Sequence, residues 1–269
     1  MNFITYSLSD IGKIRERNED SFLEKTITSQ YEKKGVLLVV ADGMGGHKAG
    51  DVASKTLVSI FDNCSNQAEQ TNYQSFLEDL ILQANQKIID LANSNLDYNG
   101  MGTTCTAMVI ADDKSYIGHV GDSRAYLVRK NEVKQLTKDH TVAEQMHQMG
   151  MITKEQAINS PRRNMLLKAV GIHHDLEVDI LEPISILNED IFILCSDGLI
   201  EYVDEDEIMS LATLYEPQKA CEIMVSTANK RGGKDNITVQ ITKINNKTNN
   251  NKINGIFSYI KKIIKSSRS

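Results

Sequence analysis

Five aspartates stand where apolar, strand-like segments of the sequence begin or end. Each alone is an ordinary turn residue, because aspartate favours turns and caps through local hydrogen bonds. Three of them neighbour glycine, in "ADG", "GDS" and "SDG". If all five met at one end of a sheet, their charges would repel strongly, so cations would have to lie among them. The five are Asp20 before "SFLEK", Asp42 after "LLVVA", Asp122 in "GHVGDS", Asp197 after "IFILCS" and Asp235 before "NITVQI".

The glycine-rich turn after Asp42 first suggests a phosphate-binding loop between a strand and a helix. It lacks the Lys-Ser/Thr ending of a P-loop and the G-x-G-x-x-G of a dinucleotide loop, and Asp42 would repel a phosphate there. Carboxylates, a backbone carbonyl and waters form an oxygen set that suits Mg²⁺ or Mn²⁺, whereas no His/Cys cluster offers a zinc site. We therefore expect Asp42 to bind metal, although a lone Asp-Gly more often caps a turn.

Composition favours one large domain with a tail. The chain has 269 residues, of which 41% are hydrophobic, and a net charge of −6, which argues against nucleic acid as a ligand. Its start has no signal-peptide pattern, and its longest aliphatic run, Val36 to Ala41, is too short to span a bilayer. Four scattered cysteines suit a reducing compartment. These features predict a cytoplasmic protein.

The last 25 residues differ from the rest. Residues 245–269 hold six Lys and Arg and no acid, so residues 1–244 carry a net charge of −12. "NNKTNNNK" is typical of a flexible linker, and the segment after it predicts an amphipathic helix with a basic face. Such a helix suits an anionic membrane surface, but docking on the acidic body or disorder are alternatives. The apolar face consists of Ile253, Ile256, Phe257, Ile260, Ile263 and Ile264.

The body alternates blocks of helices and strands. Helical spacing covers Ala49–Cys64, Tyr73–Ala92 and the region of Ala220–Ala228, which Gly232 should end. Val36–Ala41 and residues 190–195 resemble buried strands, residues 103–136 form a meander with three turns, and residues 236–244 alternate as a last strand. Hairpins beside amphipathic helices predict an α+β layered sandwich.

Eight ordered motifs across residues 1–242 resemble the bacterial form of the metal-dependent serine/threonine phosphatases of the type-2C family. The resemblance implies a central antiparallel β-sandwich flanked on both sides by helix pairs, in four layers. It also implies hydrolysis of phosphoserine and phosphothreonine in phosphorylated proteins, a serine/threonine kinase as the opposing partner, and a monomer whose catalytic domain spans residues 1–244. The motifs are "GKIRERNEDS", "VVADGMGGHKAGDVAS", "GTTCTAMVI", "GHVGDSRAYL", "LTKDHT", "RRNMLLKAVG", "ILCSDGL" and "GGKDNITV".

The same resemblance assigns roles to individual residues. Asp42 is expected to bridge two Mn²⁺ or Mg²⁺ ions, with the Gly43 carbonyl on one ion and Asp197 and Asp235 on the other. Asp122, together with Asp197, matches the site of a third, weaker ion. Glu19 and Asp20 resemble residues that hold the waters of the metal site, and Arg15 matches the arginine that binds phosphate.

Two positions depart from the family pattern. Eukaryotic relatives have a histidine, a candidate general acid, where Met44 stands here, and His47 is a candidate replacement. Bacterial relatives commonly have histidine at the place of Ser160, in the flap of residues 137–171. The flap methionines Met146, Met149 and Met151 suit either substrate contact or packing beneath a loop.

Two other functions compete with phosphatase activity. A catalytically inactive family member could act as a phosphoprotein-binding scaffold, but it would be expected to lack one or more of the aspartates, and all are present. A nucleotide-binding signalling protein could use the glycines from Gly43 to Gly50.

Overall fold

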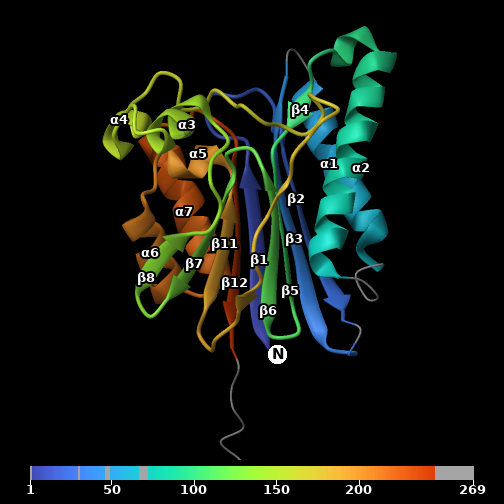
Figure 1. The fold of residues 1–269 in the computed structure, drawn as a ribbon. Helices are drawn as coiled ribbons and strands as arrows, with labels where there is room; N and C mark the ends of the chain where they lie inside the picture. Colours follow the sequence, from blue (N-terminus) through green and yellow to red (C-terminus); the bar gives the residue numbers. More distant parts are fainter. Residues whose placement is uncertain (1, 30, 46–48, 67–71, 246–269) are drawn as a thin grey trace, which may run out of the picture.

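The computed structural model describes every residue except 1, 30, 46–48, 67–71 and 246–269. Two antiparallel sheets pack face to face, with helices outside each (Figure 1). The first sheet has the order β1 (Phe3–Asp10), β12 (Ile237–Ile244), β11 (Ile191–Cys195), β7 (Arg124–Arg129), β8 (Glu132–Gln135). The second has the order β10 (Ile184–Ser185), β6 (Lys114–Val120), β5 (Cys105–Ala111), β3 (Lys34–Met44), β2 (Asp20–Thr28), with β4 (Gly102–Thr103) on β3 and β9 (Asp179–Ile180) on β6.

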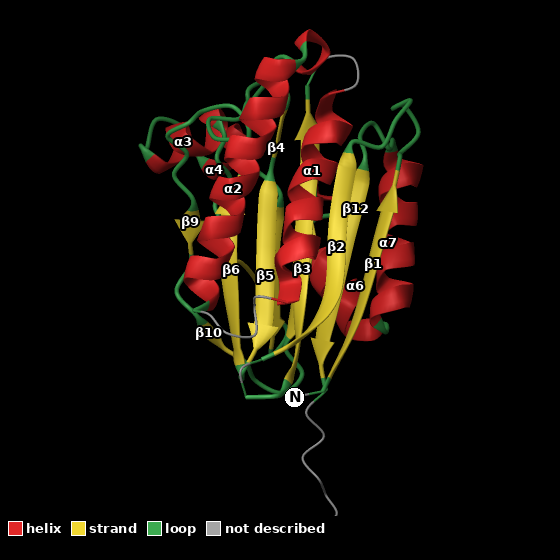
Figure 2. Cartoon of the chain, turned by 90° about the vertical axis from the view of Figure 1, so that its right-hand side faces the viewer, coloured by secondary structure: helices red, strands yellow, loops and turns green. Residues whose placement is uncertain are grey.

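Helices form the two outer layers. α1 (Ala49–Cys64) and α2 (Tyr73–Ser94) cover the second sheet, and the short helix η2 (Leu96–Tyr98) follows α2 (Figure 2). α5 (Asp197–Ile200), α6 (Glu205–Leu214) and α7 (Pro217–Arg231) cover the first sheet. α3 (Val142–Gln148) and α4 (Lys154–Ile158) lie beside one end of the sandwich (Figure 1). The predicted α+β sandwich of four layers is confirmed.

Three apolar cores hold these layers together. One lies between α1, α2 and the second sheet, one between α5–α7 and the first sheet, and one between the two sheets. β3 contributes to two of them, because Leu37 and Val39 face the helices while Leu38 and Val40 face the other sheet. This explains why the sequence of β3 is continuously apolar rather than alternating.

The helices predicted from the sequence agree closely with α1, α2 and α7 of the structure. α1 has the predicted bounds, α2 extends two residues past the predicted end, and Gly232 caps α7. The last strand, β12, does alternate in sequence, but both of its faces are buried. Its polar side chains face the second sheet, where Gln240 donates to the Leu23 carbonyl of β2. Within their own sheet they contact β1, where Thr242 lies against Thr5 and Gln240 donates to Ser7.

Among the described residues, no helix is both long and apolar enough to cross a membrane. The tail of residues 253–269 lies outside the described residues, as does His47.

Candidate functional site

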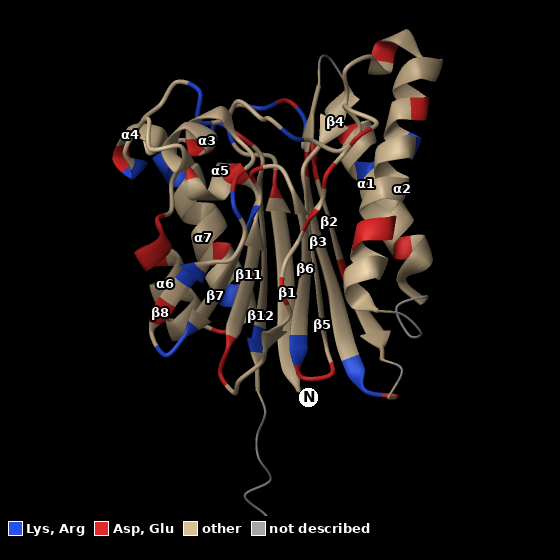
Figure 3. Ribbon diagram, in the orientation of Figure 1, with Lys and Arg blue, Asp and Glu red and all other residues tan. Residues whose placement is uncertain are grey.

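The structure brings the five aspartates together at one end of the sandwich. Asp20 begins β2 and pairs directly with Asp42 of β3 across the ladder. Asp197 begins α5 immediately after β11, and Asp235 lies two residues before β12. Acidic positions crowd this end of the strands (Figure 3). The Asp42 carboxyl is close enough to the other four for each of their charges to raise its pKa.

The backbone of Asp42 is fixed by the segment that leads into β5. Its N–H donates to Thr104 Oγ1 at 2.9 Å, and its carbonyl accepts from the Thr104 N–H at 2.8 Å and from the Thr103 hydroxyl at 3.0 Å. Both backbone polar groups are therefore satisfied within the protein. The partly exposed carboxylate remains as the group that can bind a ligand.

Two glycines let the start of α1 approach the end of β3. A Cβ on Gly43 would lie 2.1 Å from the Gly50 carbonyl oxygen, and a Cβ on Gly50 would lie 2.7 Å from Glu19 Oε1 and 2.8 Å from the Gly43 oxygen. The Gly43 carbonyl and the Glu19 carboxylate thus border the same small space, which a side chain at position 50 would fill. Burial raises the pKa of Glu19. Two oxygens converging on this space suit a hard cation and its waters.

Asp20 is held rigidly by hydroxyl groups. Its Oδ2 accepts from Ser196 at 2.8 Å and from Thr238 at 2.6 Å, whereas its buried Oδ1 has no hydrogen-bond partner among the described residues. Burial raises the pKa of Asp20 to about 7, against the two hydroxyl donors. An unpartnered buried carboxylate oxygen is costly unless a ligand or water satisfies it.

The charges at the site are not balanced by the protein alone. Burial and then the neighbouring carboxylates raise the pKa of Asp42 well above its usual value, and burial and then Asp235 raise that of Asp197 to about 6. Within the described part of the chain, no three acidic, His or Cys side chains enclose a single ion by themselves. Mg²⁺ needs no such cage, because it binds through one or two carboxylates and keeps several waters. The residues therefore fit divalent cations.

Arg15 reaches the site from the loop between β1 and β2. Its Nη2 lies 2.7 Å from Asp235 Oδ2, and its side chain is 47% exposed. The hydrogen bond to Asp235 raises the pKa of the guanidinium, so Arg15 is charged at any physiological pH. Asn236 anchors the loop, because its Nδ2 donates to the carbonyls of Ile11 and Arg17.

Asp122 lies in the turn after β6 and is buried. Burial and then Asp197 raise its pKa. The turn is tied to Asp42 through two side chains, because Thr104 Oγ1 lies 2.7 Å from Ser123 Oγ. Asp122 and Asp42 are thus fixed relative to one another.

The flap borders the same end of the sandwich. Asn164 Nδ2 lies 3.3 Å from Asp197 Oδ2, and Arg163 pairs with Glu201 at 3.0 Å. Ser160 accepts a hydrogen bond from the Arg162 N–H, so it stabilises a local turn. Met149 and Met151 are 62% and 66% exposed and do not pack beneath the loop.

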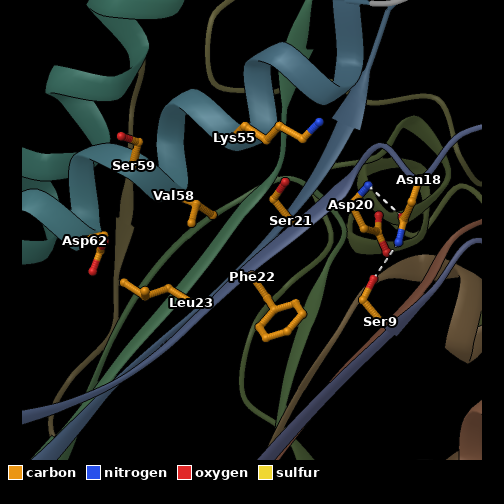
Figure 4. A pocket seen from close by; sticks show the side chains of 10 residues that line it. All are labelled: Ser9, Asn18, Asp20, Ser21, Phe22, Leu23, Lys55, Val58, Ser59 and Asp62. Carbon is orange, nitrogen blue, oxygen red and sulfur yellow. Dashed lines mark hydrogen bonds between the residues drawn. The ribbon is translucent and has the colours of Figure 1, made fainter.

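An open groove of about 450 Å³ runs from Asp20 along β2 and α1 (Figure 4). Asn18 marks its inner end, where it donates to Ser9 and accepts from the Asp20 N–H. Phe22 and Val58 contribute apolar surface.

Sequence reasoning missed the residues that support the aspartates. Thr104, Ser196, Thr238 and Asn164 each contact one of them. "GTT", "CSDG", "RRN" and "GGKDNITV" contained these residues, but nothing in the sequence set them apart from other Ser, Thr and Asn.

Comparison with known proteins defines the class. The sequence model described as protein phosphatase 2C matches residues 14–239. The chain belongs to this family and is a protein serine/threonine phosphatase.

Individual relatives agree. The serine/threonine phosphatase stp of Listeria innocua is 37% identical over 245 residues, which span 88% of this chain and 94% of the relative. The crystal structure of the Mycobacterium tuberculosis phosphatase PstP/Ppp is 31% identical, with a TM-score of 0.82 over 90% of this chain and 99% of that one. A PstP catalytic domain in complex with 2 manganese ions is 30% identical, with a TM-score of 0.80 over 91% and 99% of the two chains.

Proposed function

We propose that this phosphatase hydrolyses phosphoserine and phosphothreonine in proteins with two Mn²⁺ or Mg²⁺ ions in the acidic cluster. The observation that carries the proposal is the group of mutually repelling carboxylates around Asp42, next to the exposed guanidinium of Arg15. When bound, paired ions supply an activated water for in-line attack and neutralise phosphoryl charge.

The protein's own groups hold and orient these components. Asp42 would hold both ions, together with the Gly43 carbonyl for one of them and Asp197 and Asp235 for the other. Glu19 and Asp20 orient the surrounding waters, and Asp20 suits this role because two hydroxyls fix its carboxylate. A third, weaker ion would lie between Asp122 and Asp197.

Arg15 binds the phosphate of the substrate. A guanidinium fork grips two phosphoryl oxygens and holds the phosphorus in line with the attacking water. The proposal requires no covalent phosphoenzyme. Burial raises the pKa of the Cys105 thiol and raises that of Cys195 to about 12, which disfavours either thiol as a nucleophile. Met44 cannot donate a proton to the leaving group. His47 remains the candidate donor from the sequence.

The substrates are phosphorylated proteins, and a serine/threonine kinase is the expected opposing enzyme. We further propose that the protein acts as a monomer and that residues 253–269 attach it to an anionic membrane surface. Support for attachment is the excess of Lys and Arg in residues 245–269 beside a run of isoleucines. Flotation with anionic and neutral vesicles tests it. Full-length protein should float with anionic vesicles better than a chain that ends at Asn245, and equal flotation would rule attachment out.

Phosphate release from a phosphothreonine peptide tests the proposed chemistry. Release should require Mn²⁺ or Mg²⁺, stop with a chelator and resume when metal is restored. Release that persists after complete metal removal would contradict the proposal. Nucleotide titration with and without Mn²⁺ separates the competing function, because tight nucleotide binding without turnover would favour a nucleotide-binding protein.

A further inference from the structure

Both backbone polar groups of Gly121 bind the same residue, His140. The Gly121 N–H donates to His140 Nδ1 at 3.1 Å, and the Gly121 carbonyl accepts from the His140 N–H at 2.7 Å. Gly121 directly precedes Asp122, and its φ of +108° suits glycine. A Cβ there would lie 2.6 Å from the Thr104 side chain. His140 therefore holds a turn that has little freedom to shift.

His140 also lies where the two stems of the flap meet. Its carbonyl accepts from the Leu167 N–H at 2.8 Å, and the next residue, Thr141, forms an isolated β-bridge with Leu166. The Val142 N–H then donates to the Met165 carbonyl at 2.9 Å. One residue thus contacts the Asp122 turn through its side chain and its backbone N–H, and the returning stem of the flap through its backbone carbonyl.

The imidazole is oriented from its other side. Because Nδ1 accepts a hydrogen bond, the proton of the neutral ring is on Nε2, which lies 3.1 Å from Asp179 Oδ2. This contact has a charge-pair distance but not the alignment of a hydrogen bond. His119 packs against the ring, with centroids 4.9 Å apart, and is itself fixed by the Lys138 carbonyl at 2.9 Å. The ring has few alternative orientations.

We propose that His140 is a positioning residue that joins the Asp122 turn to the base of the flap, so that the two move as one unit. Through it, a substrate that displaces the flap also shifts Asp122, and an ion bound by Asp122 stabilises the flap. This inference rests on the proposed metal role of Asp122, but the joint itself consists of contacts among protein groups. It predicts coupled motion whether or not an ion binds.

Two variants separate the side-chain contact from the backbone contacts. His140→Asn places an amide oxygen near the position of Nδ1 and can still accept from Gly121. His140→Gln carries its amide further out, towards Asp179, and leaves the Gly121 N–H without an acceptor. Both keep the backbone bonds and a neutral polar side chain. Amide hydrogen exchange of the full-length, metal-free chain then reports on residues 119–124 and 165–170 separately.

His140→Gln should raise exchange about tenfold in both segments, and His140→Asn should leave both near wild type. With Mn²⁺ present, the His140→Gln variant should also have a kcat/KM for a phosphopeptide about fivefold lower relative to that for an aryl phosphate, because only the larger substrate contacts the flap. Equal exchange in the two variants, or a rise in residues 119–124 alone, would overturn the proposal.

Asp179→Ala provides a second test if His140→Gln does not fold, because it loosens the ring without changing His140. Lys168→Ala is its control, because Asp179 also lies 3.7 Å from Lys168 Nζ in the returning stem. Asp179→Ala should raise exchange in both segments together. If exchange does not rise in both segments, the proposed joint is overturned. If the exchange result holds while phosphate release needs no metal, the proposed function fails and the joint stands.

Discussion

Arg15 Nη2 lies 2.7 Å from Asp235 Oδ2, so the group proposed to bind phosphate is paired with a carboxylate proposed to bind metal. Both side chains are partly exposed, at 47% and 27%, and an exposed pair of this kind contributes little to stability. A divalent ion at Asp235 would compete with the guanidinium for the same oxygen. Metal binding is thus expected to release Arg15 for the substrate.

Replacing Arg15 with alanine separates these two events. We expect kcat/KM for a phosphopeptide to fall about a hundredfold, the scale of losing a charged donor to the transition state. Mn²⁺ affinity, measured by calorimetry, should not fall, because the competing cation is gone. Arg231→Ala removes a guanidinium that pairs with Glu207 and is the matched control. A large loss of Mn²⁺ affinity in Arg15→Ala would contradict this account of Arg15.

The acidic cluster predicts an unusual pH dependence for the metal-free protein. Burial raises the pKa of Asp20 to about 7 and raises that of Asp42 well above its usual value. A carboxyl whose pKa is higher in the folded state keeps its proton while the unfolded chain loses it, so stability falls as pH rises from about 4 towards 7. His119, whose pKa is lowered to about 4, acts oppositely, but only below about pH 6.5.

Comparing wild type with Asp42→Asn by urea unfolding of the metal-free protein from pH 5 to pH 7 therefore isolates the aspartates, because His119 is the same in both proteins. We expect stability to fall over this range, Mn²⁺ to restore it, and Asp42→Asn to reduce the pH dependence. Asp62→Asn changes a surface carboxylate paired with Lys25 and is the control. The interpretation is wrong if Asp42→Asn and wild type show the same dependence.

The flap can be shortened without removing its anchors. Excision of the whole of residues 137–171 would delete Asp139, which pairs with Arg124, and Val170, which bridges Thr103. A short Gly-Ser linker in place of residues 143–162 spares these contacts and also keeps Asn164 on Asp197 and Arg163 on Glu201. We expect hydrolysis of a small aryl phosphate to stay within about twofold of wild type and phosphoprotein hydrolysis to fall about tenfold or more. Parallel loss of both activities would show that the flap supports the site itself rather than the substrate.

The sequence predicts the aspartates of the site better than the residues that contact them. Asp42 and Asp197 could be identified because each ends an apolar strand next to glycine, and that pattern is local. Helix α1 was equally predictable, because its buried residues recur at helical spacing. The Ser196 and Thr238 hydroxyls on Asp20 could not be identified, because their role depends on chain segments 176 and 218 residues away. Both faces of β12 are buried for the same reason: position in the sheet is a tertiary property.

The most direct test of the metal-bridging role of Asp42 is phosphate release from a phosphothreonine peptide by wild type and Asp42→Ala at saturating Mn²⁺. We expect Asp42→Ala to lose at least about a thousandfold in kcat/KM, because one carboxylate is proposed to hold both ions. Asp62→Ala should keep full activity. Calorimetry in parallel should show that Asp42→Ala no longer binds two equivalents of Mn²⁺ tightly. Equal phosphate release by Asp42→Ala and wild type would contradict the account.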